Sequence, residues 1–404
     1  MSNLMNHLCL AAAIGLAACG GSQSTDTTTP DTPTQSESPA LRQQTSLPIG
    51  VALGVGSFEP ASSIRYSPQA SQLRHLAASE FSSVVAENVM KPEYIHPQEQ
   101  QYNWSDGDYL VQFAQQNRMQ IHGHTLVWHN ALPGWMSNYS GNWENMLADH
   151  ITTIVGHYSN SISSWDVVNE AFLDDGSRRP SIWSAHIPDY LAKAYALAHA
   201  ADPDAELYYN DYNIEAVPKK LDAVLSMVTD FRTRNIPIDG IGFQMHIDRY
   251  WPSTSEIRQA FSRCVAMGLK VRISELDIRM NPGNTATALT PELAEAQRQR
   301  YREVITAYLS TVPAELRGGI TVWGLTDALS WTPWYYKIPD WPLLFDAAQR
   351  QPAAPMDLPL WSGLRLQALM AANLEDLRAV DGVDLVLRPG QSLGLVGESG
   401  SGKS

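Results

Sequence analysis

The chain has 404 residues, of which 44% are hydrophobic, so it can bury a large core and exceeds the size of one small domain. Its 42 acidic residues outnumber its 28 basic residues and give a formal net charge of −14 at pH 7. This balance argues against nucleic acid or an anionic membrane surface as a partner and suits a neutral substrate.

The first residues predict export. Residues 8–18 are apolar and mostly small, and the stretch is too short to span a bilayer, as in the core of a signal peptide, although residues 1–7 contain no Lys or Arg. The stretch ends in Leu16-Ala-Ala-Cys19-Gly20, which resembles the lipobox of bacterial lipoproteins. We therefore expect a signal peptide over residues 1–19, a lipid anchor to a membrane at Cys19 and an extracytoplasmic location. An ordinary cleaved secretory signal is the alternative.

Residues 20–47 are rich in Ser, Thr, Pro, Gln and Asp and nearly devoid of large apolar side chains, which predicts a disordered linker. The chain has 3 cysteines. If Cys9 leaves with the signal peptide and Cys19 carries lipid, Cys264 has no partner, so we expect no intrachain disulfide.

From Pro48 onward, short β-type runs alternate with longer stretches of helical periodicity. Helices are predicted over Asp189–Ala200, Lys219–Asn235 and Pro291–Ser310. The strand-like runs are Ile49–Gly54, Ser83–Asn88, Gln120–His124, Ser164–Asn169, Glu206–Asn210, Gly240–His246, Lys270–Glu275 and Gly319–Gly324. Eight such repeats predict an α/β fold, a closed (β/α)₈ TIM barrel over residues 48–372. A doubly wound open sheet is the alternative, but no glycine-rich turn follows the first strand.

Functional side chains of such a barrel lie where the strands end. The apolar runs that begin at Trp165 and Val271 each deliver a glutamate near their ends, Glu170 and Glu275. Hydrolysis of a glycosidic bond by acid/base and nucleophilic chemistry requires at least one such pair of carboxylates. The pattern therefore indicates a glycoside hydrolase.

Seven segments closely resemble glycoside hydrolase family 10, the endo-β-1,4-xylanases, and they follow the family's order between about Pro48 and Leu369. They are Glu87–Lys91, His122–His129, Trp165–Glu170, Tyr209–Tyr212, Gly242–His246, Ile273–Asp277 and Thr321–Gly324. The resemblance implies retaining, endo-acting hydrolysis of xylan through a covalent glycosyl-enzyme intermediate, without a cofactor. It makes Glu170 the acid/base and Glu275 the nucleophile.

The resemblance also implies residues that bind substrate. Asn169 is suited to bond the sugar hydroxyl beside the reacting carbon, and His246 with Asp277 behind it is suited to keep Glu275 ionised and oriented. The remaining expected substrate-binding residues are Glu87, Asn88 and Lys91 on the non-reducing side, His124, Trp128 and Gln244 around the reacting sugar, the aromatic floor and wall Trp323 and Trp331, and Tyr212. The chain departs from the family at Ala131, where a glutamine is common, so one hydrogen bond to the sugar is in question.

The spacing of His122, His124 and His129 is also compatible with zinc. No carboxylate recurs at metal-ligand spacing, however, so we expect no metal and interpret His122 and His129 as structural histidines. Trp165 and Trp183 are expected in the core.

Residues 373–404 change in character and end in a Walker A sequence, Gly397 to Ser404, that follows a strand-like run. The segment resembles the opening of the ATP-binding subunit of a bacterial ABC transporter. The helix that would cradle phosphate and the acidic Mg²⁺ ligand are missing, so we expect a truncated, non-functional fragment without ATP binding. Beside a xylan hydrolase, two further hypotheses are a glycan-binding lipoprotein on an inactive barrel and a nucleotide-dependent transport component.

Overall fold

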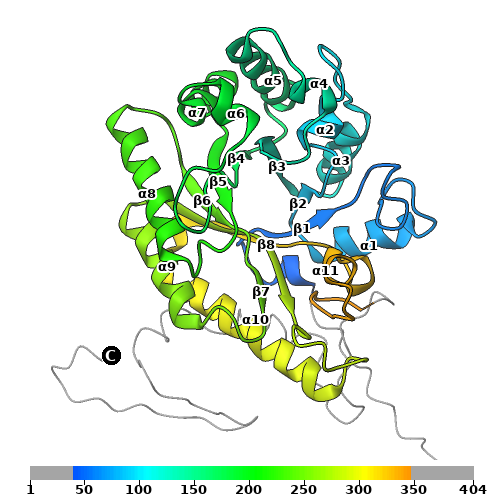
Figure 1. The fold of residues 1–404 in the computed structure, drawn as a ribbon. Helices are drawn as coiled ribbons and strands as arrows, with labels where there is room; N and C mark the ends of the chain where they lie inside the picture. The colour runs from blue at the N-terminus through cyan, green and yellow to red at the C-terminus, as the bar shows by residue number, and fades with distance from the viewer. Residues whose placement is uncertain (1–39, 347–404) are drawn as a thin grey trace, which may run out of the picture. The chain divides into compact units, whose positions relative to one another are not determined.

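The computed structural model describes residues 40–346 (Figure 1). The predicted signal peptide, most of the predicted linker and the ABC-like fragment lie outside this range. The predicted end of the barrel domain at residue 372 lies outside it as well.

Nine parallel strands are present in the described residues, and they line up in the order β6-β5-β4-β3-β2-β1-β9-β8-β7. Their bounds are β1 Ile49–Leu53, β2 Ser83–Ala86, β3 Gln120–Val127, β4 Ser164–Asn169, β5 Glu206–Asp211, β6 Gly240–Phe243, β7 His246–Asp248, β8 Lys270–Arg279 and β9 Arg317–Val322. Because β6 also pairs with β8, strands β1–β6, β8 and β9 close into a ring. The prediction of a (β/α)₈ barrel is confirmed.

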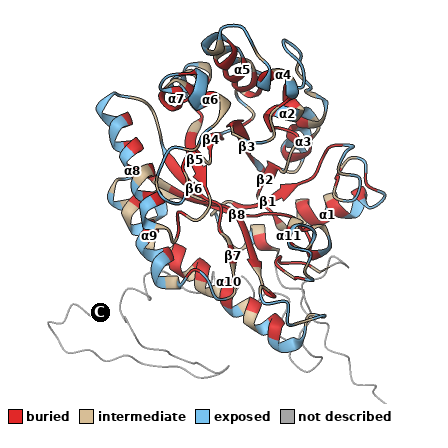
Figure 2. Cartoon of the chain, in the orientation of Figure 1, coloured by how far each residue is buried: buried red, intermediate tan, exposed pale blue. Residues whose placement is uncertain are grey.

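Helices surround the ring of strands (Figure 1). They are α1 Ala70–Glu80, α2 Pro92–Ile95, α3 Ser105–Gln116, α4 Gly134–Ser137, α5 Trp143–Tyr158, α6 Ile182–His186, α7 Tyr190–Ala201, α8 Pro218–Thr233, α9 Thr254–Ala266, α10 Pro291–Thr311 and α11 Trp331–Tyr336, with single 3₁₀ turns at Leu41–Gln43, Ala314–Leu316 and Asp327–Leu329. The strands are almost entirely buried, whereas exposed residues mark the outer faces of the helices (Figure 2). None of the helices within residues 40–346 is both long and apolar enough to cross a bilayer.

The three predicted helices are confirmed as α7, α8 and α10, with ends that differ from the predicted ones by at most two residues. The start of α10 follows the sequence signal, because the Thr290 hydroxyl caps the helix by accepting from the Leu293 amide and Pro291 takes the first helical position. The start of α9 has a capping box between Ser253 and Glu256.

The predicted strand Gly240–His246 is wrong in one respect, because the structure divides it into β6 and β7. Met245 has a φ of 58°, a left-handed conformation that interrupts the strand between the two pieces. After the break, His246 pairs with Asp277 on β8. The break thus carries Gln244 and His246 into the mouth of the barrel, where β8 continues past the end of β6.

The core fills the space between the strands and the helices. Trp165 and Trp183 are 0% and 1% exposed, as expected for core residues, and the single described cysteine, Cys264, is a buried free thiol. Gly123 on β3 makes room for Trp165, since a side-chain carbon at that position would collide with the indole ring. This packing fixes β3 against β4, the two strands that lead to Trp128 and Glu170.

Candidate active site

The two predicted catalytic glutamates lie at the same end of the barrel. Glu170 directly follows β4, and its amide donates to the Asn210 carbonyl on β5 at 2.9 Å. Glu275 lies within β8, and its amide donates to the Gln244 carbonyl at 3.1 Å. Because the strands are parallel, their carboxyl ends converge on one face, which is where (β/α)₈ enzymes place their sites.

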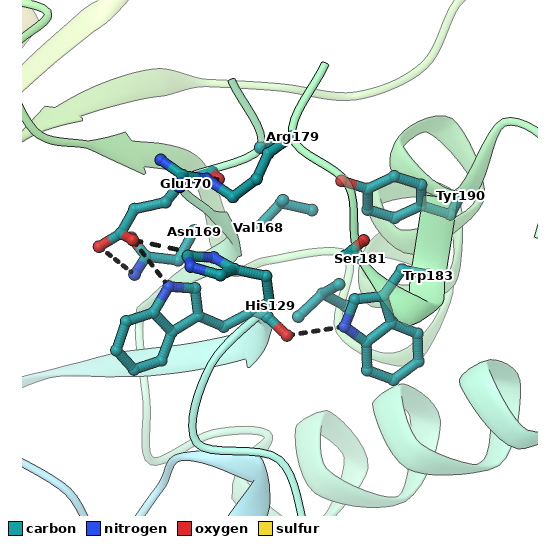
Figure 3. Close-up of a pocket in the computed structure, with 11 residues that line it drawn as sticks. His129, Val168, Asn169, Glu170, Arg179, Ser181, Trp183 and Tyr190 are labelled. Carbon is teal, nitrogen blue, oxygen red and sulfur yellow. Dashed lines mark hydrogen bonds and ion pairs between the residues drawn. The ribbon is translucent and has the colours of Figure 1, made fainter. Parts of the chain in front are cut away.

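The backbone of Glu170 is held in an uncommon conformation. Its φ is 58°, in the left-handed region that non-glycine residues rarely adopt. The Glu170 carbonyl accepts from Arg179 Nε at 2.8 Å, and the next amide, of Ala171, donates to the Tyr209 hydroxyl at 2.9 Å. Figure 3 shows the Arg179 side chain beside Glu170. These contacts fix the direction in which the Glu170 side chain leaves the strand.

The Glu170 carboxylate is surrounded by hydrogen-bond donors. Its Oε2 accepts from Trp128 Nε1 at 3.0 Å, and its Oε1 accepts from Gln244 Nε2 at 3.0 Å and from Asn169 Nδ2 at 3.3 Å. His129 Nδ1 lies 3.9 Å from Oε2 (Figure 3). The indole that bonds Glu170 is itself held in place, because the Trp128 carbonyl accepts from Trp183 Nε1 at 2.7 Å.

Glu275 is held by a cationic histidine. Its Oε2 lies 3.1 Å from His246 Nε2, and His246 Nδ1 lies 2.8 Å from Asp277 Oδ2, which also accepts from Trp331 Nε1 at 2.8 Å. Since both imidazole nitrogens face carboxylate oxygens, both must carry a proton. Burial alone would lower the pKa of His246, but the charge of Asp277 and the hydrogen bonds to Asp277 and Glu275 raise it to about 10.

This arrangement keeps Glu275 ionised. Burial alone would raise the pKa of Glu275, which is 5% exposed. The hydrogen bond from His246 and the neighbouring charge of His124 outweigh burial and hold the pKa below its ordinary value. The predicted roles of His246 and Asp277 around Glu275 agree with this geometry.

Three amide side chains connect the two glutamates. Asn210 Nδ2 donates to Glu275 Oε1 at 2.7 Å and to Asn169 Oδ1 at 3.0 Å. Gln244 Nε2 donates to the same Asn169 oxygen at 3.3 Å as well as to Glu170. The two carboxylates therefore belong to one hydrogen-bonded unit of side chains.

The predicted residues of the non-reducing side lie beside aromatic rings. Lys91 Nζ donates to Asn88 Oδ1 at 2.8 Å and lies 5.1 Å from the ring centroid of Trp128 and 5.8 Å from that of Trp323. Burial lowers the pKa of Lys91, and burial together with the charge of Glu59 raises the pKa of Glu87 to about 7. This part of the site offers amide, ammonium and carboxyl groups next to flat apolar faces, a combination suited to sugar hydroxyls and pyranose rings.

Trp323 and Trp331, the predicted aromatic floor and wall, each pack against a histidine of the site, His124 or His246. His124 is buried, bonds Asp166 Oδ2 through Nδ1 at 2.9 Å, and lies 5.4 Å edge-on from Trp323. Trp331 packs edge-on against His246 at 5.1 Å. Trp323 thus packs against His124 and Trp331 against His246, and their roles as floor and wall of the sugar site stay a prediction.

Tyr212, predicted to contact sugar, lies between two cationic side chains. Its hydroxyl accepts from Arg179 at 2.8 Å, and the Lys220 ammonium lies 3.5 Å from its ring centroid. Tyr212 therefore also braces the arginine that holds the Glu170 backbone. Ala131 contributes no polar side-chain atom, and its carbonyl accepts from the Glu93 amide at 2.7 Å.

The histidines considered for zinc have other partners. His122 bonds the Ser164 hydroxyl and lies 3.1 Å from Asp166, which it shares with His124, whereas His129 lies near Glu170. Within residues 40–346, no group of three or more His, Cys, Asp or Glu side chains is arranged to hold a metal ion. Asp166 has a pKa far below its ordinary value, because the hydrogen bonds and charges of the two histidines outweigh the opposing effect of burial.

Four residues of this network were not among the predicted site residues: Asn210, Asp166, Arg179 and Glu59. Asn210 and Asp166 lie on strands that carry predicted residues, so their position at the barrel mouth was a usable signal. Arg179 lies nine residues beyond Glu170 in an irregular loop, and Glu59 lies in the connection after β1. No local pattern indicates that either of these two contacts the site.

The barrel brings together an ionised glutamate, a second glutamate among neutral donors, and aromatic walls. Glycoside hydrolases use this combination of groups. The chain belongs to glycosyl hydrolase family 10, whose family model matches residues 44–356. The endo-1,4-beta-xylanase B of Thermotoga neapolitana is 39% identical over 283 residues, which are 69% of this chain and 80% of that protein. The endo-1,4-beta-xylanase A of Cellvibrio japonicus is 39% identical over 334 residues, 76% of this chain and 54% of the relative.

Solved structures show the same likeness. A mutant of xylanase 10C from Cellvibrio japonicus in complex with xylopentaose superposes with a TM-score of 0.74 at 38% identity, covering 82% of this chain and 69% of that one. Native xylanase 10B from Thermotoga maritima has a TM-score of 0.74 at 33% identity, covering 83% of this chain and 99% of that one. The chain spans about half the length of the two Cellvibrio relatives, the xylanases A and Xyn10C.

The histidine that holds Glu275 gives a prediction about pH. Replacing His246 with Asn removes the cation that keeps Glu275 ionised, so the acidic limb of the kcat/KM profile should move up by about one pH unit or more. A matched control is His199→Asn, an exposed histidine on α7, which should leave the limb in place. An unchanged acidic limb in His246→Asn would show that His246 does not set the ionisation of Glu275.

The same histidine affects stability in the alkaline range. The pKa of His246 is raised from an ordinary 6.5 to about 10, so its ion pairs stabilise the folded state fully below pH 6.5. That stabilisation should be lost progressively as the pH rises from there through about 10. Unfolding by denaturant at several alkaline pH values should therefore show a smaller decline for His246→Asn than for the wild type.

Proposed function

We propose that this chain is a retaining, endo-acting β-1,4-xylanase that works through a covalent glycosyl-enzyme intermediate. The observation that carries this proposal is the asymmetry between the glutamates. Glu275 is kept ionised by His246, whereas Glu170 is surrounded mainly by neutral amide and indole donors. A carboxylate nucleophile and a proton donor are the two groups that retention requires.

In the first step, a Glu275 oxygen attacks the anomeric carbon while protonated Glu170 gives its proton to the leaving glycosidic oxygen. The glycosidic bond breaks, an ester to Glu275 forms, and Glu170 becomes a carboxylate that the donors of Trp128 and Gln244 stabilise. In the second step, Glu170 takes a proton from water, whose oxygen replaces Glu275 at the anomeric carbon. Two inversions leave the configuration unchanged.

The choice of xylan as substrate is supported by the relatives, which are xylanases, and by the solved neighbour that holds xylopentaose. Lys91, Asn88 and the rings of Trp128 and Trp323 provide polar contacts and flat surfaces for consecutive sugars. Product analysis on xylan, arabinoxylan and carboxymethylcellulose tests the proposal. We expect a rapid fall in the viscosity of xylan with release of short oligosaccharides, whereas binding of xylan without new reducing ends would identify a glycan-binding protein instead.

For the location we propose attachment to a membrane outside the cytoplasm through lipid on Cys19, which lies outside the described residues. The support is the lipobox-like segment alone. Incorporation of labelled palmitate that is lost in Cys19→Ser would support the anchor, and release of unlabelled protein into the medium would indicate ordinary secretion.

We also propose that residues 373–404 are an ABC-like fragment that takes no part in the reaction. These residues lie outside the described structure, and the Walker A sequence is the only support for their origin. Titration calorimetry of the full chain with ATP should show no binding, whereas saturable micromolar binding would contradict this proposal.

A further inference from the structure

An exposed aromatic stack lies beside the non-reducing side of the site and is not used by the proposed chemistry. Phe58, in the connection between β1 and α1, is 45% exposed and stacks on Tyr94 with ring centroids 4.1 Å apart and an interplanar angle of 6°. A side-chain carbon at Gly56 would collide with the Phe58 ring, so the backbone there packs directly against it. The ring is therefore fixed, yet almost half of its side chain stays open to solvent.

The loop that carries Phe58 is tied to the active site through its neighbour Glu59. The Glu59 carboxylate accepts from the amides of Val55 and Gly56 at 3.0 Å and 3.2 Å. Its other oxygen accepts from the Asn88 side-chain amide. One carboxylate thus holds the loop closed and couples it to a residue expected to bind sugar.

Tyr94, the other ring of the stack, is tied to the same place. It lies on α2, which begins immediately after Lys91, and Lys91 bonds Asn88. The neighbouring Glu93 amide donates to the carbonyl of Ala131, the position at which the chain lacks the common glutamine. Both rings are therefore anchored to the groups that line the non-reducing side of the cleft.

We propose that the Phe58–Tyr94 stack binds one further pyranose unit of the substrate chain, one sugar beyond the unit held by Glu87, Asn88 and Lys91. This inference rests on the proposed function, because it assumes a β-1,4-linked xylose chain in the cleft. An aromatic ring offers a pyranose face an apolar surface without demanding a particular hydroxyl pattern. Stacking at this site offsets the polar contact that Ala131 cannot make.

A second exposed aromatic on the same β1–α1 connection provides a matched control. Tyr66 is 46% exposed, but its hydroxyl bonds Asp106 on α3 at 3.2 Å, and Arg65 lies 5.0 Å from its ring centroid. These contacts direct Tyr66 toward α3. Phe58→Ala and Tyr66→Ala therefore remove similarly exposed rings from the same connection. Only Phe58 belongs to the stack proposed to bind sugar.

The test compares kcat/KM for nitrophenyl β-xylobioside and nitrophenyl β-xylotrioside, which differ by one sugar at the non-reducing end. In the wild type the third sugar should raise kcat/KM, and Phe58→Ala should lose that gain by roughly tenfold while its bioside rate stays unchanged. Phe58→Trp should keep the gain, and Tyr66→Ala should behave as the wild type. Equal melting temperatures of the variants exclude unfolding as the cause.

The other outcomes overturn the inference. If Phe58→Ala keeps the full gain, or the wild type has none, the stack binds no sugar. If both substrates slow down equally, Phe58 acts only by supporting Asn88. A wild type that hydrolyses neither glycoside would contradict the proposed function itself. This result differs from the results that contradict only sugar binding by the Phe58–Tyr94 stack.

Discussion

Replacing Glu275 with Ala should reduce hydrolysis of both xylan and aryl xylobiosides by roughly 10⁴-fold or more, because it removes the carboxylate proposed to attack the anomeric carbon. Glu275 is bonded by His246 and Asn210, so its replacement eliminates the proposed nucleophile while leaving both supporting residues in place. The measurement is kcat/KM on nitrophenyl β-xylobioside beside the melting temperature of the variant. Glu275→Gln, which keeps the shape of the side chain, should lose as much activity.

Azide provides a positive readout for the same variant. The small cavity left by the carboxylate admits azide to the face from which Glu275 attacks, so an activated glycoside should yield an α-xylobiosyl azide. NMR of the product identifies the anomer. Near wild-type turnover of xylan by Glu275→Ala, or formation of the β-azide, would contradict the role of nucleophile.

Replacing Glu170 with Ala should have an effect that depends on the leaving group. A general acid contributes about 10²–10⁴-fold where the leaving oxygen needs a proton, so xylan hydrolysis should fall by that order. A dinitrophenyl leaving group departs without protonation, so formation of the glycosyl-enzyme should change little. A burst of dinitrophenol followed by slow turnover is the expected signature. The second step is slow because Glu170 is no longer present to take a proton from the attacking water.

Azide again separates the roles of the two glutamates. In Glu170→Ala it should restore turnover by attacking the glycosyl-enzyme from the opposite face, which gives the β-azide. Equal losses on xylan and on the dinitrophenyl glycoside would show that Glu170 is not the proton donor. Glu170→Gln is the control, because it keeps the shape of the side chain and one acceptor oxygen for the Trp128 hydrogen bond but cannot give a proton.

The sequence was sufficient for the barrel because its periodicities are local. Each buried parallel strand reads as an apolar run, and Thr290-Pro291 marks the start of α10 through its own side chains. It was not sufficient for the break at Met245, since the apolar pattern continues there and the left-handed turn follows from the pairing of His246 with Asp277 on β8. The presence of each strand could therefore be predicted from the sequence. The residues at which a strand ends could not, because they depend on pairing with neighbouring strands.

The same distinction holds for the site. Glu170, Glu275, His246 and Asp277 could be predicted because each lies in a short motif at which an apolar run gains polar residues. Arg179 and Glu59 could not, since their contacts with the Glu170 carbonyl and with Asn88 are made by irregular loops whose path depends on the folded barrel. The directly reacting groups are encoded in short motifs, whereas the groups that orient them are assembled by tertiary structure.

Retention of configuration by Glu275 and Glu170 is tested most directly by proton NMR of the first product formed from a β-linked xylooligosaccharide. The spectrum must be recorded before mutarotation equilibrates the anomers. The two-step mechanism predicts that the β-anomer appears first and that the α-anomer grows in later. A first product in the α-configuration would contradict the account.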